Sequence, residues 1–444
     1  MSKLLDEILS NDNMNLAFKS VKANKGTYGV DEVTLDDLSE YIKVNWKDIK
    51  SKIEERKYYP LPVRRVQIPK PNGSKRNLGI PTVMDRVIQQ AMVQVLTPIC
   101  EEYFSNYSYG FRPNRSCEMA ITKVLEFMND GYTYIVDIDL EKFFDNVPHD
   151  KLMSYVHEII KDGDVESLIF KYLKAGVMVN GKYEKSTLGT PQGGNLSPLL
   201  SNIYLNILDK ELEARNLHFT RYADDCVILV KSEASAKRVM ESITKWIEKK
   251  LGLKVNVTKT KIVRPNNLKY LGFGFYYDFK SGKYYCRPHE DSIAKFKRNL
   301  KKITSRSISI DFKTRIKKLN EVIRGWVNYF AISNMKGMMR EIDSHLRTRL
   351  RIVLWKQWKV PSKRQWALQK LGVNKDLARI TSYCGDRYYW VVTKTVVVRA
   401  ISKEKLALAG LVSPLDYYLK QHTLKLNYKG LIEPPIAERH DVVV

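Results

Sequence analysis

The stretch that decides the fold is His218-Phe219-Thr220-Arg221-Tyr222-Ala223-Asp224-Asp225-Cys226-Val227-Ile228-Leu229-Val230, in which two mainly apolar runs flank two carboxylates. Such a pattern predicts a β-hairpin with the Asp pair at its tip. A lone Asp pair is usually a solvated turn, because Asp favours turns. Two adjacent carboxylates also repel each other, however, and a nearby cation relieves that repulsion.

A third carboxylate lies upstream, at the end of a second predicted strand. Residues 134–140 read Tyr-Ile-Val-Asp-Ile-Asp-Leu and place Asp139 near the strand's end. Asp137 shares a face with Asp139, because residues i and i+2 of a strand point the same way, and it ranks as a fourth candidate. Three carboxylates on one sheet would hold two Mg²⁺ ions, with Mn²⁺ as a substitute, for in-line phosphoryl transfer.

The charge of the chain indicates a polyanionic partner. The 444 residues carry 75 Lys and Arg against 49 Asp and Glu, a formal net charge of +26. Residues 290–360 alone hold 18 basic and 6 acidic residues, so +12 of this charge is concentrated there. Three Trp residues, Tyr329 and Phe330 lie among these basic residues, so the segment suits nucleic acid, although part of the aromatics should be ordinary helix-packing core.

Other classes of protein are disfavoured by the sequence. No run of about 18 apolar residues occurs, so no membrane partner is expected. The five cysteines are widely scattered, without a C-x-x-C pair or a Cys/His cluster, which argues against disulfides and structural zinc. The length predicts two to four compact units.

Apolar spacing predicts the remaining elements. Residues 63–80 should form a basic hairpin around the turn signal at 69–74. An extended run over residues 253–263 and a hairpin over 268–275 should follow the carboxylate hairpin, and a short β-pair is expected around residues 388–398. Helices are expected at residues 85–104, 117–129, 150–161, 164–175, 199–215 and 233–251.

Three motifs occur in order: residues 138–145 (Ile-Asp-Leu-Glu-Lys-Phe-Phe-Asp), residues 190–193 (Thr-Pro-Gln-Gly) and residues 222–225 (Tyr-Ala-Asp-Asp). In this order they resemble motifs A, B and C of reverse transcriptases. With residues 108–116 and 324–330, the wider match resembles bacterial group II intron-encoded reverse transcriptase/maturases over nearly the whole chain to about residue 420. It is most similar to the group IIC class, whose members lack an HNH endonuclease domain.

The resemblance implies an α+β multidomain fold of the right-hand polymerase type. Fingers and a palm with an antiparallel sheet would be followed by an α-helical thumb and a small C-terminal domain. The expected divisions are an N-terminal extension at residues 1–62, fingers and palm at 63–288, thumb or maturase X domain at 289–360, DNA-binding domain at 361–420 and a loosely ordered tail at 421–444.

Carried over position by position, the resemblance assigns Asp139, Asp224 and Asp225 to catalysis and metal binding. It implies that the incoming nucleotide is held by two groups of residues. The first group is a pair of cations on the fingers hairpin, Lys70 and Arg76. The second group lines the pocket and consists of Phe143, Phe144 and Gln192. Phe144 would be the steric gate against a 2′-hydroxyl, with Phe143 as the competing assignment. Lys259 or Lys261 would be the proton donor to pyrophosphate, and a solvated lysine is the alternative for each.

Basic side chains outside this pocket are expected to contact phosphates without base specificity. The candidates are Arg64, Arg112, Arg115, Lys297, Arg298, Arg347, Arg349 and Arg351. The implied partners are group II intron RNA in a ribonucleoprotein, an RNA template with a DNA primer, a DNA target and deoxynucleoside triphosphates. A cytoplasmic bacterial protein is expected, as a monomer or a homodimer.

The leading hypothesis is therefore an RNA-directed DNA polymerase that also binds its parent intron RNA to assist splicing and retrohoming. One alternative is a maturase that acts only as an RNA-binding splicing factor. The intact Asp139, Gln192, Asp224 and Asp225 argue against that loss of polymerase function. Another is a domesticated reverse transcriptase in phage defence. The segment containing Gly325-Trp326 weighs against it.

Overall fold

The computed structural model describes residues 2–69, 73, 75–191 and 193–426. The chain folds into two compact units that divide between Arg264 and Pro265. Within the described residues no helix is both long and apolar enough to cross a lipid bilayer. Lys70 and Gln192, two of the predicted nucleotide contacts, lie outside the described residues.

The first unit contains ten α-helices in its described part, and several begin with a side-chain cap. Ser116, for example, accepts a hydrogen bond from the backbone N–H of Met119 at the start of α5, and Ser232 does the same for Ser235 in α10. The helices are α1 (Lys3–Ile8), α2 (Asn11–Ala23), α3 (Leu38–Glu54), α4 (Val83–Glu101), α5 (Cys117–Asn129), α6 (Phe143–Asn146), α7 (His149–Ile160), α8 (Gly163–Lys174), α9 (Ser197–Ala214) and α10 (Glu233–Trp246), which ends in the π-helical turn η1 (Ile247–Leu251).

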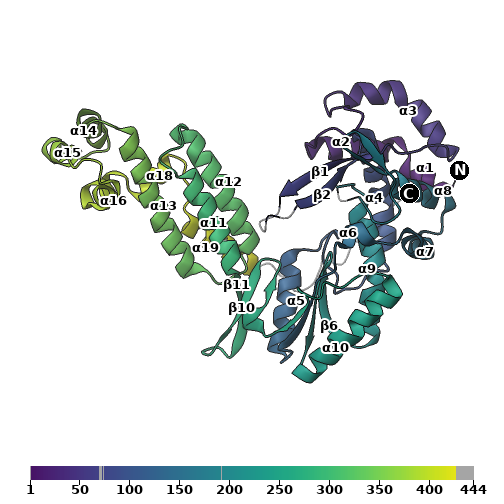
Figure 1. Ribbon diagram of the computed structural model, residues 1–444. Coiled ribbons are helices and arrows are strands. Elements are labelled where there is room, and N and C mark those ends of the chain that lie inside the picture. Colours follow the sequence, from purple (N-terminus) through teal and green to yellow (C-terminus); the bar gives the residue numbers. More distant parts are fainter. Residues whose placement is uncertain (1, 70–72, 74, 192, 427–444) are drawn as a thin grey trace, which may run out of the picture. The chain divides into compact units, whose positions relative to one another are not determined.

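Two four-stranded sheets complete the first unit. The fingers sheet has the order β2-β1-β4-β5, built from β1 (Val63–Pro69), β2 (Lys75–Ile80), β4 (Val177–Val179) and β5 (Lys182–Glu184). The palm sheet has the order β6-β7-β3-β8, built from β3 (Tyr134–Ile138), β6 (His218–Tyr222), β7 (Asp225–Val230) and β8 (Lys261–Val263), with every pair antiparallel. Helices α9 and α10 pack on this sheet, and α5 lies along its β6 edge (Figure 1).

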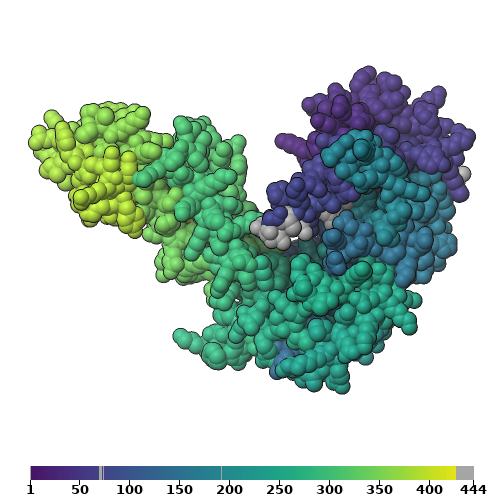
Figure 2. All heavy atoms as spheres, viewed as in Figure 1, coloured from purple at the N-terminus to yellow at the C-terminus, as the bar shows by residue number. Residues whose placement is uncertain are grey.

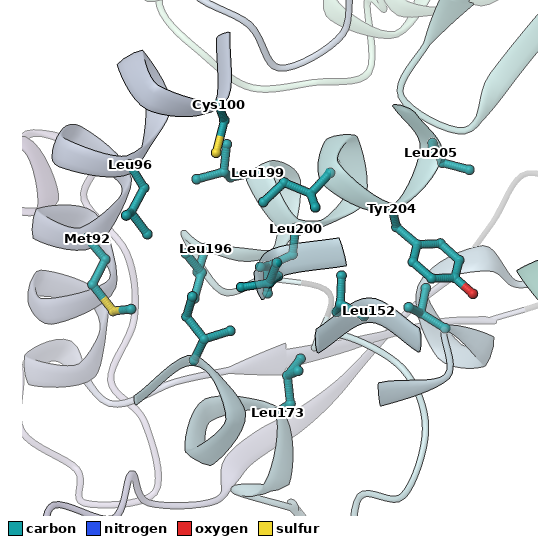
Figure 3. Packing of buried hydrophobic residues seen from close by; sticks show 14 of the residues in the cluster. Met92, Leu96, Cys100, Leu152, Leu173, Leu196, Leu199, Leu200, Tyr204 and Leu205 are labelled. Carbon is teal, nitrogen blue, oxygen red and sulfur yellow. The ribbon is translucent and has the colours of Figure 1, made fainter. Parts of the chain in front are cut away.

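One apolar core joins the helices of the first unit. Met92, Leu96 and Cys100 of α4 face Leu199 and Leu200 near the start of α9, as Figure 3 shows. Leu152 of α7 and Leu173 of α8 pack into the same cluster. Residues of the N-terminal helices, such as Leu5 and Ile8, pack into the same core. The Ser2 hydroxyl also donates to Asp162 beside α8, and Figure 2 shows the purple N-terminal segment lying against the teal part of the first unit. The core thereby fixes the frame on which the palm sheet is held.

The second unit begins with a short 3₁₀ turn, η2 (Pro265–Asn267), and a three-stranded sheet of order β11-β10-β9. Its strands are β9 (Lys269–Tyr270), β10 (Phe273–Asp278) and β11 (Lys283–Pro288). The helices that follow are α11 (Glu290–Ile303), α12 (Phe312–Phe330), α13 (Lys336–Gln357), α14 (Pro361–Lys370), α15 (Lys375–Ser382), α16 (Tyr388–Thr393), α17 (Thr395–Ala400), α18 (Lys403–Leu408) and α19 (Pro414–Leu426). Helix α19 packs on α12 and α13.

The predicted mixed α+β fold and most predicted elements are confirmed, with three differences. Residues 388–398 are not a β-pair but the helices α16 and α17, because Val391, Val392 and Val397 are fully buried and tertiary packing overrides the β-propensity of valine. The sheet β9–β11, which the prediction grouped with the palm, belongs to the second compact unit, where the ring centroids of Phe273 and Phe330 lie 4.8 Å apart. Helix α19 continues past the predicted boundary at 420.

Candidate active site

The palm sheet brings three carboxylates to one end. Tyr222 pairs with Asp225, so Ala223 and Asp224 form the two-residue turn of the β6–β7 hairpin, with Ala223 at a φ of 57°. On the other side of β7, Ile138 of β3 pairs with Cys226. The next position along β3 is Asp139, which therefore lies beside Asp225. The hairpin and the central strand thus supply the set of acidic groups that the sequence predicted.

The carboxylates lie in an environment that opposes their charge. Burial, followed by the charges of Asp224, Asp137 and Asp139, raises the pKa of Asp225 to about 6. Burial also raises the pKa of Asp224, against a lowering contribution from Arg76. The pKa of Asp137 is raised to about 6, again mainly by burial. A cation bound near these carboxyl groups would favour their charged form and lower their pKa.

Two lysines after α10 supply positive charge to this cluster. Lys259 Nζ lies 3.1 Å from Oδ2 and 3.3 Å from Oδ1 of Asp139. Lys261 pairs with Asp137 across β8 and β3, and its charge lowers the pKa of Asp137. The backbone N–H of Asp139 donates to Thr260 Oγ1 at 3.2 Å, which ties the 256–260 turn to the end of β3. Of the two predicted proton donors, Lys259 directly contacts Asp139, one of the three predicted catalytic carboxylates.

The carboxylate set suits a hard divalent cation, although it is not a finished metal centre. Within the described ranges, no three His, Cys, Asp or Glu side chains are arranged as a ready metal site, and Asp139 is instead paired with Lys259. Asp139, Asp224 and Asp225 offer only oxygen donors, the type that Mg²⁺ and Mn²⁺ prefer. Burial, followed by the neighbouring carboxylates, raises the pKa of Asp225, and a bound cation would favour its charged form.

A buried ion pair holds the β6–β7 turn, which we call the carboxylate turn, against α9. Arg221, 1% exposed, donates from Nε and Nη2 to Asp209 of α9 at 2.7 and 2.6 Å. The same guanidinium donates to the carbonyl of Ala223 at 2.9 Å and to Asn202 at 3.0 Å. A fork of fixed donors therefore links the turn to α9. Sequence reasoning did not single out Arg221, and its only signal was its place next to the motif.

The loop after α4 also packs against this turn. A Cβ on Gly110 would lie 2.3 Å from the backbone nitrogen of Ala223, so only glycine allows this approach. Arg112, a predicted phosphate contact, is buried instead: it pairs with Glu101 and donates to the carbonyl of Ser108 at 2.9 Å. That prediction was wrong, because the loop needs a buried donor for its carbonyls. Arg115 similarly donates to Asn106 at 2.8 Å.

The two phenylalanines of the first motif are separated by the structure. Phe143 is 2% exposed and belongs to the core of the first unit, whereas Phe144 is half-buried and packs against it at 5.1 Å between ring centroids. Only Phe144 therefore keeps a surface that a sugar ring could contact. The role of steric gate stays a prediction for Phe144, and the competing assignment to Phe143 is removed by its burial.

The second motif and the fingers hairpin approach each other closely. A Cβ on Gly193, which has a φ of 125°, would lie 2.7 Å from the carbonyl oxygen of Gly79 in β2. Arg76 is exposed on the same strand, and its charge lowers the pKa of Asp224. Arg64 on β1 instead donates to the carbonyl of Tyr28 at 2.8 Å and lies over the Tyr28 ring. Arg64 thus anchors the loop before α3.

A basic groove lies between α11 and α13 in the second unit. The cavity of about 450 Å³ is lined on both helices by cationic and imidazole side chains, namely Lys297, Arg298, Lys301, His345 and Arg349. Lys297 and Arg298, two of the predicted phosphate contacts, are exposed there. Lys301, which follows Lys297 by one helical turn on α11, and His345 of α13 line the same groove but were not among the predicted contacts. The helical spacing could have indicated Lys301, whereas His345 joins the others only when α13 packs beside α11.

The three arginines of α13 do not form one surface. Arg351 is buried and donates to the carbonyl of Ile401 at 3.0 Å, so its prediction as a phosphate contact was wrong. Arg347 forms an ion pair with Asp343, and Arg349 donates to Thr304 Oγ1 at 2.6 Å. Alternate residues of a helix point about 200° apart, so residues 347, 349 and 351 cannot share a face.

The chain matches two protein families along its length. Residues 68–275 match the reverse transcriptase (RNA-dependent DNA polymerase) family, and residues 293–372 match the maturase-specific domain of group II introns. Together these matches include the carboxylate hairpin in the first unit and the α11–α13 groove in the second.

Several known proteins are similar in sequence. Protein YkfC of Escherichia coli K12 is 36% identical over 285 residues, which are 55% of this chain and 75% of YkfC. The group II intron-encoded protein LtrA of Lactococcus lactis subsp. cremoris is 41% identical over 223 residues, 50% of this chain and 37% of LtrA. Among solved structures, a partial Cas6-RT-Cas1–Cas2 complex matches with 22% identity and a TM-score of 0.36, over 56% of this chain and 43% of that one.

Proposed function

Because the chain belongs to the group II intron-encoded reverse transcriptase/maturase family, we propose that it copies RNA into DNA at the palm site formed by Asp139, Asp224 and Asp225. The observation that carries this proposal is the register of the palm sheet, which sets Asp139 of the central strand beside Asp225 of the hairpin. The divalent ions are Mg²⁺, with Mn²⁺ as a substitute, and the nucleotides are deoxynucleoside triphosphates.

The carboxylates serve by holding metal ions. When bound, two divalent ions lower the pKa of a primer 3′-hydroxyl and offset the charge of the leaving pyrophosphate. Asp139, Asp224 and Asp225 supply the oxygen ligands, and Arg221 holds the turn that carries two of them. Lys259, which contacts Asp139, is placed to give a proton to the pyrophosphate, and Lys261 is the second candidate.

The incoming nucleotide is held by groups around this centre. Arg76, whose charge acts on Asp224, binds phosphate oxygens together with Lys70 of the same hairpin. Phe144 contacts the sugar and excludes a 2′-hydroxyl by size. Gln192 lines the pocket beside Gly193. These four roles follow from the family motifs and the approach of Gly193 to β2.

The α11–α13 groove binds the sugar-phosphate backbone of nucleic acid. Lys297, Arg298 and Lys301 present their charges on one helix face, and the maturase-specific family covers both helices. We include intron RNA, the template–primer duplex and the DNA target among its ligands, with contacts that do not depend on base sequence. In splicing the chemistry belongs to the RNA, and the protein contributes charge and shape.

Primer extension on an RNA template with Mg²⁺ and deoxynucleotides tests the proposal. The wild type should extend the primer, and Asp224→Asn should lose product because one charged ligand becomes neutral. Asp130→Asn, which changes an exposed Asp at the C-terminus of α5, is the matched control and should behave like the wild type. A folded wild type that made no DNA but bound intron RNA tightly would overturn the proposal and favour the splicing-factor alternative.

A further inference from the structure

Residues 188–190, at the start of the second motif, pair directly with the turn that carries Phe144. We call residues 143–146, helix α6, the gate turn, and residues 188–190 the loop base. The backbone N–H of Thr190 donates to the carbonyl of Phe144 at 2.7 Å, and that of Gly189 donates to Val147 at 2.8 Å. Leu188 also forms an isolated bridge with Pro148. The two segments, far apart in sequence, therefore share one set of backbone hydrogen bonds.

The close pairing leaves no room for a side chain at position 189. Gly189 has a φ of +85°, and a Cβ there would lie 2.7 Å from the carbonyl oxygen of Phe144 and 2.8 Å from that of Asp145. A small shift of the loop base therefore pushes on the gate turn itself.

His149 holds that peptide from the far side. It is the first residue of α7, is 2% exposed, and has Nε2 at 2.7 Å from the carbonyl oxygen of Gly189. Because a carbonyl can only accept, Nε2 must carry the proton and donate it. Burial lowers the pKa of His149, which favours the neutral ring. Nδ1 is buried without a hydrogen-bond partner in the described part of the chain, so the ring is held by this one bond.

We propose that His149 is a positioning residue for nucleotide selection. Its hydrogen bond to the Gly189 carbonyl clamps the loop base onto the gate turn, and thereby fixes how closely Phe144 can approach the sugar of the incoming nucleotide. His149 touches no substrate and takes part in no chemical step. The proposal rests on the polymerase function proposed above, and it extends that function to a residue outside the three motifs.

The test compares two replacements of similar size in the full-length chain. His149→Gln keeps an N–H donor within reach of the carbonyl, whereas His149→Leu keeps apolar volume and removes the donor. The readout is the ratio of kcat/KM for a deoxynucleotide to that for the matching ribonucleotide in primer extension. His157→Leu is the control, because His157 is an exposed residue of the same helix, paired with Glu166.

We expect His149→Leu to lower this ratio about tenfold, the effect of losing one buried hydrogen bond, while kcat for the deoxynucleotide changes less than the ratio does. His149→Gln and His157→Leu should keep the wild-type ratio. A His149→Leu enzyme that folds and discriminates like the wild type would overturn the proposal. So would a folded His149→Gln enzyme with a lowered ratio, because it keeps the donor to the Gly189 carbonyl; this arm decides the matter if His149→Leu does not fold. Absence of synthesis by the wild type would instead refute the polymerase function.

Discussion

The charged form of Asp225, which the proposed metal binding requires, is disfavoured by the fold around it. Burial, followed by the charges of Asp224, Asp137 and Asp139, raises the pKa of its carboxyl to about 6. For an acid, a raised folded-state pKa means that the native state binds more protons than the unfolded chain between about pH 4 and pH 6. Stability contributed by this group is therefore present at low pH and is lost as pH rises through that window.

Replacing Asp225 by Asn should therefore stabilise the protein without metal while abolishing polymerisation. We expect a higher Tm for Asp225→Asn than for the wild type at pH 7.5 in EDTA, and a smaller difference at pH 4.5, where the wild-type carboxyl is protonated. Calorimetry at both pH values makes the comparison. An equal or lower Tm at pH 7.5 would contradict the prediction, since neither burial nor the neighbouring carboxylates would then oppose the charge of Asp225 in solution.

Phe144 and Phe143 are neighbours in sequence with different expected roles. Phe144→Ala should raise the efficiency of ribonucleotide incorporation, on the order of 100-fold, because the bulk that excludes a 2′-hydroxyl is removed. Steady-state kinetics with both sugars measures this change. Phe143→Ala is the contrasting variant: its side chain is 2% exposed, so it should cost about 3–5 kcal/mol of stability, measured by denaturant unfolding. Unchanged selectivity in a folded Phe144→Ala enzyme would reject the gate.

At the scale of elements, the pair of Arg221 and Asp209 joins β6 to α9 with both side chains almost fully buried. Asp209→Asn should destabilise the protein by about 3–5 kcal/mol, because it leaves the guanidinium buried without its counter-charge. Urea unfolding measures the loss. The double variant Asp209→Leu with Arg221→Met removes both charges and should recover much of the stability.

That double variant separates support of the fold from support of the site. It lacks the donor to the Ala223 carbonyl, so primer extension should stay impaired even when stability returns. Recovery of full activity together with stability would show that the carboxylate turn holds its shape without Arg221.

The elements also show how far sequence patterns reach. The 117–129 helix agrees with α5 to the residue, because a Ser cap and an apolar stripe act locally. Residues 388–398 were predicted as strands from their valines and tyrosines, yet they form α16 and α17. Their buried valines pack among helices of the second unit, and none of its described strands β9–β11 pairs with them. Local propensity was outweighed by the surrounding helices.

At the scale of the whole molecule, the net charge of +26 should make nucleic-acid binding strongly salt-dependent. The double variant Lys297→Ala with Arg298→Ala should weaken binding to unrelated RNA sequences equally and lower the slope of log K against log salt by about two, since about one unit is lost per phosphate contact. Filter binding over a salt series measures the slope.

Lys245→Ala gives the matched control for that series. Lys245 is exposed in the first unit and paired with Glu241, outside the α11–α13 groove, so its loss should leave the slope unchanged. Equal slopes for the groove variant and the control would exclude the groove as a phosphate-binding surface.

The sequence by itself determined the hairpin of residues 218–230, the order of the three motifs and the positive net charge that favours a polyanionic partner. Each of these depends on neighbouring residues or on composition. Only the tertiary structure decided which basic side chains are free. Arg112 and Arg351 are held by buried carbonyls, whereas Lys297 and Arg298 stay exposed. It also brought Arg221 and His149 to the two loops that carry the site. Burial and hydrogen-bond pairing join residues distant along the chain, and no local pattern encodes them.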